Sequence, residues 1–169
     1  SCAVTEDRTA QCWGDNSHGQ FGVGDTSSHT GVVAVPGLSD IKLLTLGEEH
    51  SCAIQTAGTV KCWGSNDQGQ VGNGQVTSVE VTTPTTVAGV SDARSAEAAG
   101  DRTCLDHANG DISCWGNGDW AGLGNGKTIF ATTPSPLPGL SGLSAIGSGP
   151  SNSCAASSSA TYCWGGNNY

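Results

Sequence analysis

The sequence has little positive charge, no methionine and no long apolar run. Six lysine and arginine residues stand against fifteen aspartate and glutamate residues, which gives a net charge of −9 over 169 residues. Because no cluster of basic residues is present to bind phosphate groups, we expect no nucleic-acid partner. No stretch approaches the roughly 20 apolar residues of a transmembrane helix, and we therefore expect no membrane insertion.

Helix-forming residues are also scarce. Charged residues make up 12% of the chain and hydrophobic residues 36%, whereas glycine alone accounts for 26 positions. Glycine together with Asn, Asp, Ser and Thr favours short strands joined by tight turns over helices. The composition therefore predicts an all-β protein with almost no helix.

The cysteines reveal an internal repeat. Equivalent cysteines recur after 50, 52 and 50 residues, and the second member of each pair always opens the tripeptide Cys-Trp-Gly. Periods of this length are typical of propellers and arrays, in which each unit buries its apolar face against its neighbours. We divide the chain into repeats at about 1–49, 50–101, 102–151 and 152–169, within one segment spanning 1–169. The cysteine pairs are Cys2/Cys12, Cys52/Cys62, Cys104/Cys114 and Cys154/Cys163.

Each pair fits opposite positions of a β-hairpin. If Gln55 faces Thr59 across a three-residue loop, Gly58 takes the left-handed position of that loop and Cys52 lies opposite Cys62. The fourth pair is one residue closer, which a two- or four-residue loop accommodates. Directly opposed residues have Cβ atoms about 4.5–5.5 Å apart, close to what a disulfide needs. We predict four disulfides within hairpins.

The alternative is a zinc site, but zinc ligands usually come from closely spaced C-x2–4-C knuckles, unlike these pairs. We therefore expect no metal and no cofactor. Disulfides persist in oxidising compartments, so we predict an extracellular or cell-surface location.

A polar, glycine-rich loop follows each Cys-Trp-Gly, at 15–24, 65–74 and 117–126. One apolar residue in each loop is predicted to enter the core, and the repeated tryptophans are predicted to pack between units. An apolar segment such as 41–46 precedes the next hairpin, so each period provides about four strands, the content of one propeller blade. The apolar loop residues are Phe21, Val71 and Leu123, and the tryptophans are Trp13, Trp63, Trp115 and Trp164.

Residues 63–74 read Trp-Gly-Ser-Asn-Asp-Gln-Gly-Gln-Val-Gly-Asn-Gly. This closely resembles the core Trp-Gly-x-Asn-x-x-Gly-Gln-Leu-Gly-x-Gly of the regulator of chromosome condensation repeat family, although the third copy has Ala121-Gly122 in place of Gly-Gln. The resemblance implies a β-propeller, commonly of seven blades, built from about four antiparallel strands per blade. A full ring would need about twice this length, so we expect an incomplete ring of three blades plus flanking pieces, completed by further sequence or by a second chain.

The paired cysteines resemble those of secreted, disulfide-containing bacterial members of the family. The resemblance implies binding of another protein across one face. Nucleotide exchange and chromatin docking, which the nuclear members perform, do not fit the acidic charge and the cysteine pairs.

No pattern of catalytic residues stands out, and we predict that the protein is not an enzyme. The four histidines (His18, His29, His50 and His107) occupy different places in the repeat and are interpreted as surface residues. The segment 48–50, Glu-Glu-His, is interpreted as a solvated blade edge. The glycine-rich loops lack the Lys-Ser/Thr of a phosphate-binding loop.

One column varies inside the otherwise constant loop, and loops on a rigid scaffold are where binding residues gather. We predict that a protein partner contacts this column, with the aromatic residues as anchors. The hypothesis is a secreted or cell-surface, non-catalytic binding module. Two alternatives stay open, an assembly subunit that associates with itself to complete a ring and a lectin-like propeller. The candidate residues are His18, Gln68, Trp120 and Tyr169.

Overall fold

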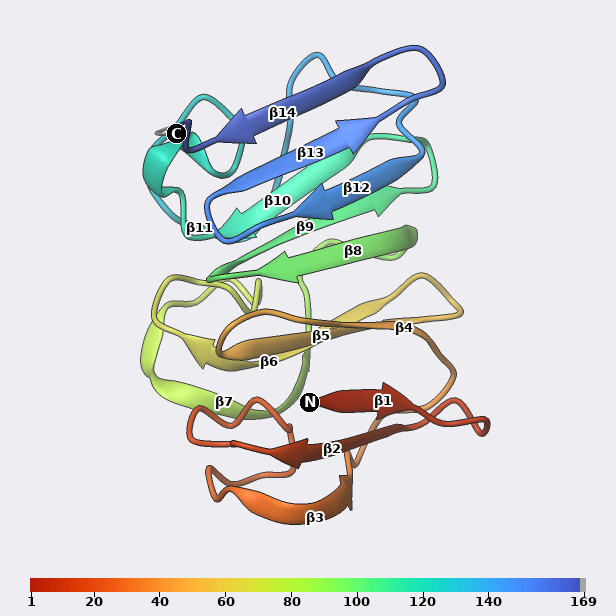
Figure 1. Ribbon diagram of the computed structural model, residues 1–169, viewed down its shortest axis with the longest axis vertical. Coiled ribbons are helices and arrows are strands. Elements are labelled where there is room, and N and C mark those ends of the chain that lie inside the picture. Colours follow the sequence, from red (N-terminus) through yellow and green to blue (C-terminus); the bar gives the residue numbers. More distant parts are fainter. Residues whose placement is uncertain (168–169) are drawn as a thin grey trace.

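The computed structural model describes residues 1–167, which form four antiparallel β-sheets stacked in chain order (Figure 1). The first sheet contains β1 (Cys2–Val4), β2 (Ala10–Gly14) and β3 (His29–Ala34). The second contains β4 (Ile41–Leu46), β5 (His50–Gln55), β6 (Val60–Asn66) and β7 (Thr77–Thr86). The third contains β8 (Ala93–Ala99), β9 (Arg102–His107), β10 (Ile112–Gly116) and β11 (Ala131–Pro136). The fourth contains β12 (Ala145–Ser148), β13 (Asn152–Ala156) and β14 (Thr161–Gly165).

Helix is nearly absent from the described residues. They contain one 3-10 turn, η1 (Asp119–Ala121), in the loop after β10. No helix within residues 1–167 has the length and apolarity that crossing a bilayer requires. The prediction of an all-β chain is confirmed.

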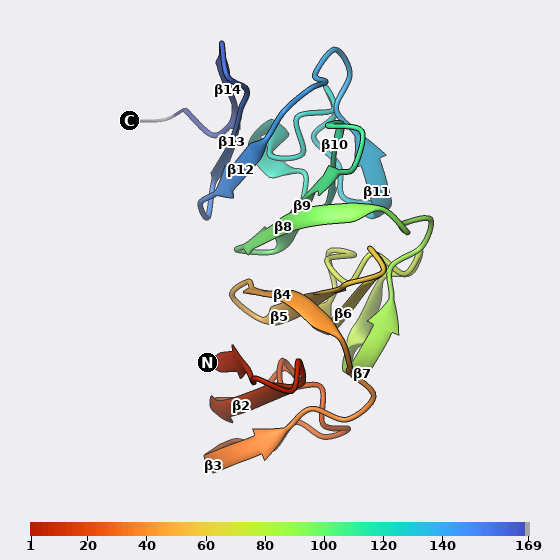
Figure 2. The same ribbon diagram turned by 90° about the vertical axis from the view of Figure 1, so that its right-hand side faces the viewer.

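The four sheets fan out as consecutive blades of an open ring. The second and third sheets have four strands each, and the two end sheets have three. The innermost strands lie beside one another from sheet to sheet, β4 next to β8 and β8 next to β12, whereas β7 and β11 lie on the opposite side (Figure 2). The first and fourth sheets are at opposite ends of the stack, so the ring is not closed. This confirms the predicted propeller fold and incomplete ring.

The predicted hairpin register is confirmed. Cys52 pairs with Cys62 and Ile54 with Val60, and Gly58 in the connecting turn has a φ of 83°. The shorter fourth hairpin keeps its cysteines opposed by using a four-residue turn between Ala156 and Thr161. Loop length therefore changes while the register at the cysteines is kept.

All four predicted disulfides form across hairpins. They join Cys2–Cys12, Cys52–Cys62, Cys104–Cys114 and Cys154–Cys163, with Cα atoms 4.0–4.1 Å apart, and no cysteine is free. Each disulfide fixes the alignment of the two strands of its hairpin. These strands carry the loops described below.

The core lies between sheets rather than within them. In β5, Ala53 packs into the core shared with the first sheet, whereas Cys52 and Ile54 pack into the core shared with the third. A strand covered on both faces shows no alternation of polar and apolar residues. The predicted loop plugs are fully buried in these cores (Phe21, Val71 and Leu123), as are the tryptophans of the two complete sheets (Trp63 and Trp115).

Candidate functional site

The sheets expose two different faces at the ends of their strands. We call the loop face the one formed by the turns β4–β5, β8–β9 and β12–β13 together with the long loops after β2, β6 and β10. We call the hairpin face the opposite one, formed by the turns β1–β2, β5–β6, β9–β10 and β13–β14 and by the linkers between sheets. In Figure 1 the loop face is on the left.

Side chains inside the long loops hold the first two loops in one conformation. Asn16 Oδ1 accepts a hydrogen bond from the Phe21 amide at 2.8 Å, and Asn66 Oδ1 accepts one from the Val71 amide at 3.0 Å. The loop glutamines accept a bond from the amide two residues before them, His18 in the first loop and Gln68 in the second. These repeated bonds fix the backbone and leave one side chain per loop at the tip.

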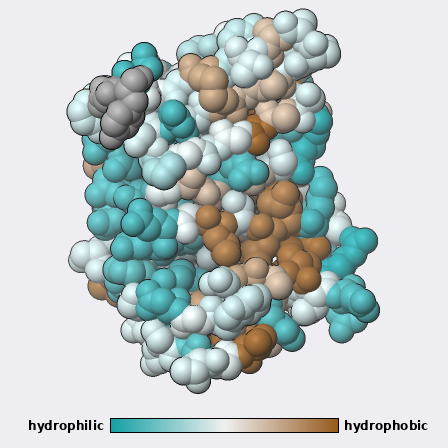
Figure 3. Space-filling model, in the orientation of Figure 1, coloured by the Kyte–Doolittle hydropathy of each residue, from teal (hydrophilic) through white to brown (hydrophobic). Residues whose placement is uncertain are grey.

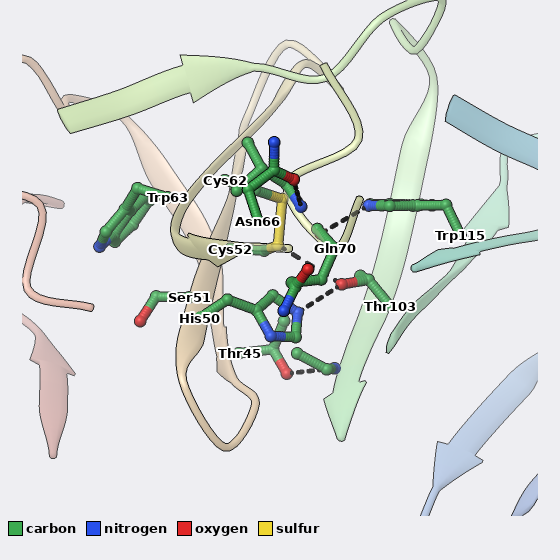
Figure 4. Close-up of a disulfide and its surroundings, with 12 residues drawn as sticks. Thr45, His50, Ser51, Cys52, Cys62, Trp63, Asn66, Gln70, Thr103 and Trp115 are labelled. Carbon is green, nitrogen blue, oxygen red and sulfur yellow. Dashed lines mark hydrogen bonds between the residues drawn. A yellow bond between two sulfur atoms is a disulfide. The ribbon is translucent and has the colours of Figure 1, made fainter. Parts of the chain in front are cut away.

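Each loop is also clamped by the tryptophan of the next sheet. The indole Nε1 of Trp63 donates to the Gln20 carbonyl at 2.8 Å, and Trp115 donates to the Gln70 carbonyl at 2.9 Å (Figure 4). The indole lies so close to the loop that a Cβ atom added at Gly72 would be 2.6 Å from Trp115 Nε1. The predicted packing between blades is confirmed for Trp63 and Trp115, whereas Trp13 is 40% exposed.

The third loop departs from this frame. Gly118 and Gly122 stand where the other loops have Asn and Gln, and η1 forms there with Trp120 and Ala121 both at a φ of 58°. A Cβ atom at Gly122 would be 2.5 Å from Arg102 Cζ, so the buried guanidinium occupies the space that a glutamine would need. Trp120 is left 66% exposed at the tip of this loop.

The Arg102 cation is held below that loop. Its Nη2 donates to the Pro150 carbonyl at 3.3 Å, and its residue is 4% exposed. Burial lowers the pKa of this guanidinium, while the charges of Asp101 and Asp119 oppose that shift. Arg102 is therefore an internal cation rather than a side chain offered to solvent.

His18 lies in a cavity between the first and second sheets. Its Nε2 is 3.2 Å from Glu49 Oε1 in the β4–β5 turn, and its Nδ1 is 3.6 Å from Glu80 Oε1 in β7. The cavity has a volume of about 170 Å³ and is lined by His18, Glu49, Ser65, Asn66, Asp67, Thr77, Ser78 and Glu80. It is a small, polar hollow with three carboxylates in its wall.

Carboxylates continue along the loop face towards the third sheet. Partial burial raises the pKa of Asp101, and the nearby charges of Asp67, Glu49 and Glu48 raise it further. Within residues 1–167, no group of three or more His, Cys, Asp or Glu side chains is arranged to hold a metal ion. Asp101, Asp67, Glu49 and Glu48 together make this part of the loop face negatively charged.

The structure places the predicted column residues His18, Gln68 and Trp120 at the corresponding tips of three consecutive loops, all on the loop face. Tyr169 lies outside the described residues. From the sequence, Glu48 and Glu49 were interpreted only as part of a solvated blade edge, and Glu80 was not singled out, because these residues come from a turn and a strand without a common spacing. The net charge of −9 gave a general signal for a negative surface.

The prediction that all four histidines lie at the surface is wrong for His50. This residue is 1% exposed, and its Nε2 lies 2.8 Å from Thr103 Oγ1 across the second and third sheets (Figure 4). Burial lowers its pKa to about 4. The sequence 48–50 therefore combines two carboxylates of the turn with one neutral core side chain.

The regulator of chromosome condensation (RCC1) repeat matches this chain at residues 1–20 and 41–70, and again at 57–105. The chain belongs to the RCC1 repeat family. None of the curated proteins compared with the chain matches it. Family membership accounts for the shared loop frame and for the tryptophan clamp between blades.

Several solved structures share the fold of this chain. Prp20p from Saccharomyces cerevisiae, described together with its binding to Gsp1p and histones, is 22% identical with a TM-score of 0.83, over 96% of this chain and 42% of its own. Human WBSCR16 is 22% identical with a TM-score of 0.80, over 95% and 44%. The ectodomain of the Physcomitrella patens receptor kinase CR4 is 24% identical with a TM-score of 0.59, over 97% and 38%. The chain thus spans about two fifths of these structures.

Proposed function

We propose that the chain is a segment of a secreted or cell-surface, non-catalytic β-propeller that binds a protein partner through its loop face. The observation that carries the proposal is the contrast within the loops. The residues that fix the first two loops are the same, and the third loop has a different internal frame, whereas the three tips carry the unlike side chains of His18, Gln68 and Trp120. A rigid frame with variable tips is the usual design of a recognition surface.

Two further observations support the setting. Four disulfides favour an oxidising compartment, because cytosolic thiols are kept reduced. Among the solved structures that share the fold, one is a receptor-kinase ectodomain, and another, Prp20p, is described with its binding to Gsp1p and histones. The extracellular location and the protein binding are properties of those two proteins. At 22–24% identity the similarity establishes the shared fold, and the two functions serve as precedents for the proposal.

Trp120 is the residue whose loss tests the proposal. Large aromatic side chains at the centre of interfaces often contribute 2 kcal/mol or more, so we expect Trp120→Ala to weaken partner binding by about tenfold or more. The measurement is affinity capture from the extracellular fraction of the source organism, followed by titration with the captured protein. Tyr162→Ala is the matched control, because Tyr162 is 46% exposed on β14, away from the loops.

Equal binding of the partner by both variants and the native chain would contradict an interface on the loop face. Capture of no specific protein would reject the binding function itself. The far-ultraviolet circular dichroism of each variant checks that its fold is intact.

Assembly by self-association is a second candidate. Trp13 is 40% exposed, whereas Trp63 and Trp115 are fully buried against the loop of the preceding sheet. A loop from another copy would cover Trp13 in the same way. Light scattering across a concentration series tests this candidate, which requires a species heavier than one chain.

A further inference from the structure

The charges of the molecule are divided unequally between its two faces. The loop face carries eight carboxylates, and its two basic residues are the buried Arg102 and Lys127 in the loop after η1. Figure 3 shows hydrophilic residues gathered along the side on which these loops lie. The acidic residues are Asp15, Asp25, Glu48, Glu49, Asp67, Glu80, Asp101 and Asp119.

The other four basic residues lie at or near the hairpin face, where three of them form hydrogen bonds or an ion pair. Lys42 Nζ donates to the Arg94 carbonyl at 2.8 Å, and Lys61 Nζ donates to the Gly37 carbonyl at 3.1 Å. Arg94 lies 3.6 Å from Asp106 Oδ2. Within residues 1–167, the one ion pair between a lysine or arginine and a carboxylate is therefore Arg94–Asp106, away from the loop face.

Among the described residues, 1–167, the ion pairs on the loop face are all formed by histidines, and the buried Arg102 acts on Asp101 and Asp119 through its charge without forming an ion pair. A single imidazole, His18, stands between Glu49 and Glu80, and Asp67 lines the same cavity. Burial raises the pKa of Asp101, and the neighbouring carboxylates raise it further, which is the direction expected for carboxylates that repel one another. Uncompensated like charges destabilise the isolated chain, and an external cation would relieve that cost.

The shape of the cavity selects the kind of cation. Its wall combines carboxylates from three separate elements with the hydroxyls of Thr77 and Ser78, and its volume is about 170 Å³. These acceptors suit the several N–H donors of an ammonium or guanidinium group. No group of three or more His, Cys, Asp or Glu side chains in residues 1–167 is arranged to hold a metal ion. An elongated organic cation therefore fits better than an inorganic one.

We infer that the loop face binds a lysine- and arginine-rich segment of the protein partner, and that one cationic side chain of this segment enters the cavity between His18, Glu49, Asp67 and Glu80. The inference rests on the proposed function and specifies the chemistry of the partner. Asp101 and Asp119 continue the negative surface towards Trp120, whose exposed ring offers a face for a second cation. The segment would run along the loop tips, across the first three sheets.

The test compares two variants with the same net charge. The loop-face variant is Glu49→Gln with Asp67→Asn and Glu80→Gln. The control, on the hairpin face, is Glu6→Gln with Asp7→Asn and Asp40→Asn, all three of which are exposed. Isothermal titration measures the affinity of each protein for a short peptide in which lysine, arginine and glycine alternate, at about 0.05 M and about 0.3 M salt.

We expect the loop-face variant to bind the peptide at least about tenfold more weakly than the native chain, and the control to change by less than about twofold. The affinity of the loop-face variant for the peptide should also depend less on the salt concentration. Equal losses in both variants would mean attraction by net charge alone and would overturn the inference, as would the absence of peptide binding at low salt.

The same variants separate this inference from the proposed function. If the partner captured through Trp120 binds the loop-face variant as well as the native chain, the inference fails and the binding function stands. If no partner is captured but the peptide shows the predicted difference, the proposed binding function fails and the cation-binding site stands.

Discussion

The His107 imidazole holds the Asp92 carboxylate, with Nδ1 2.7 Å from Oδ1, and so ties β9 to the linker that precedes β8. The other ring nitrogen of His107 lies 3.0 Å from Ser113 Oγ on β10. The three side chains contact one another in the same order as in a Ser-His-Asp catalytic triad. Ser113, however, is 6% exposed and lies in mid-strand opposite Leu105 and Pro136. The three residues lie where they can brace the junction of linker, β9 and β10.

The first prediction tests this structural interpretation. A fluorophosphonate probe, which labels activated serines, will leave Ser113 unmodified, because a nucleophile in mid-strand lacks the cleft that a substrate needs. Mass spectrometry of the labelled, digested protein is the measurement, and Ser113→Ala is the control. Probe attached to Ser113 in the native chain but lost after His107→Ala would mean that the site is a hydrolase.

The second prediction concerns the contact between Gly72 and Trp115. Gly72→Ala will destabilise the protein, because its φ is 73° and the new Cβ would lie 2.6 Å from the indole nitrogen. Gly89→Ala is the matched control, since Gly89 has a φ of 75° but no atom within 4 Å of the added Cβ. The left-handed conformation costs about 1–2 kcal/mol in both. Overpacking adds about 1–3 kcal/mol at Gly72 alone.

Denaturant unfolding of the two glycine variants measures the difference. The free energy of unfolding should be lower for Gly72→Ala than for Gly89→Ala by the overpacking contribution. Equal losses would show that the loop moves away from Trp115 without cost, and the tryptophan clamp would then contribute little to the stability of the stack.

The third prediction concerns the central disulfide. Cys52→Ala with Cys62→Ala will lower the free energy of unfolding by about 2–3 kcal/mol, the value expected for closing a short loop. The intact mass of the unreduced native protein should be lower than that of the reduced protein by two hydrogens for each of the four disulfides. A mass equal to that of the reduced chain would contradict the pairing and the oxidising compartment inferred from it.

Much of the fold was predictable from the sequence because its signals are local and repeated. The opposition of Cys52 and Cys62 follows from counting outward from the turn at Gly58, and the count holds in the other hairpins. The burial of Phe21 follows from an apolar residue placed among glycines. Each such inference needs only residues within one repeat, and the repeat checks it several times.

The candidate site was only partly predictable because it joins residues of different repeats. The contacts of His18 with Glu49 and Glu80 join two sheets, and no regular spacing along the chain predicts them. The third loop is a similar case. Its change to Gly122 makes room for Arg102, so the departure from the family pattern becomes explicable only when both residues are seen together.

The last prediction concerns stability in acid and depends on His50. Burial lowers the pKa of this residue from an ordinary value of 6.5 to about 4 in the folded chain. Above pH 6.5 the imidazole is neutral in both states and contributes no pH dependence. As the pH falls below 6.5 the unfolded chain binds a proton that the folded chain does not, so stability is lost until about pH 4.

We expect this loss to be on the order of 3 kcal/mol in the native protein. The measurement is the free energy of unfolding at a series of pH values for the native chain and for His50→Gln, which keeps a hydrogen-bonding group near Thr103 but does not titrate. Subtracting the two profiles removes the contributions of other groups, including Asp101 and Asp106, whose raised pKa values act in the opposite direction. Superimposable profiles would mean that the folded chain accommodates a charged His50, which would contradict its burial between the second and third sheets.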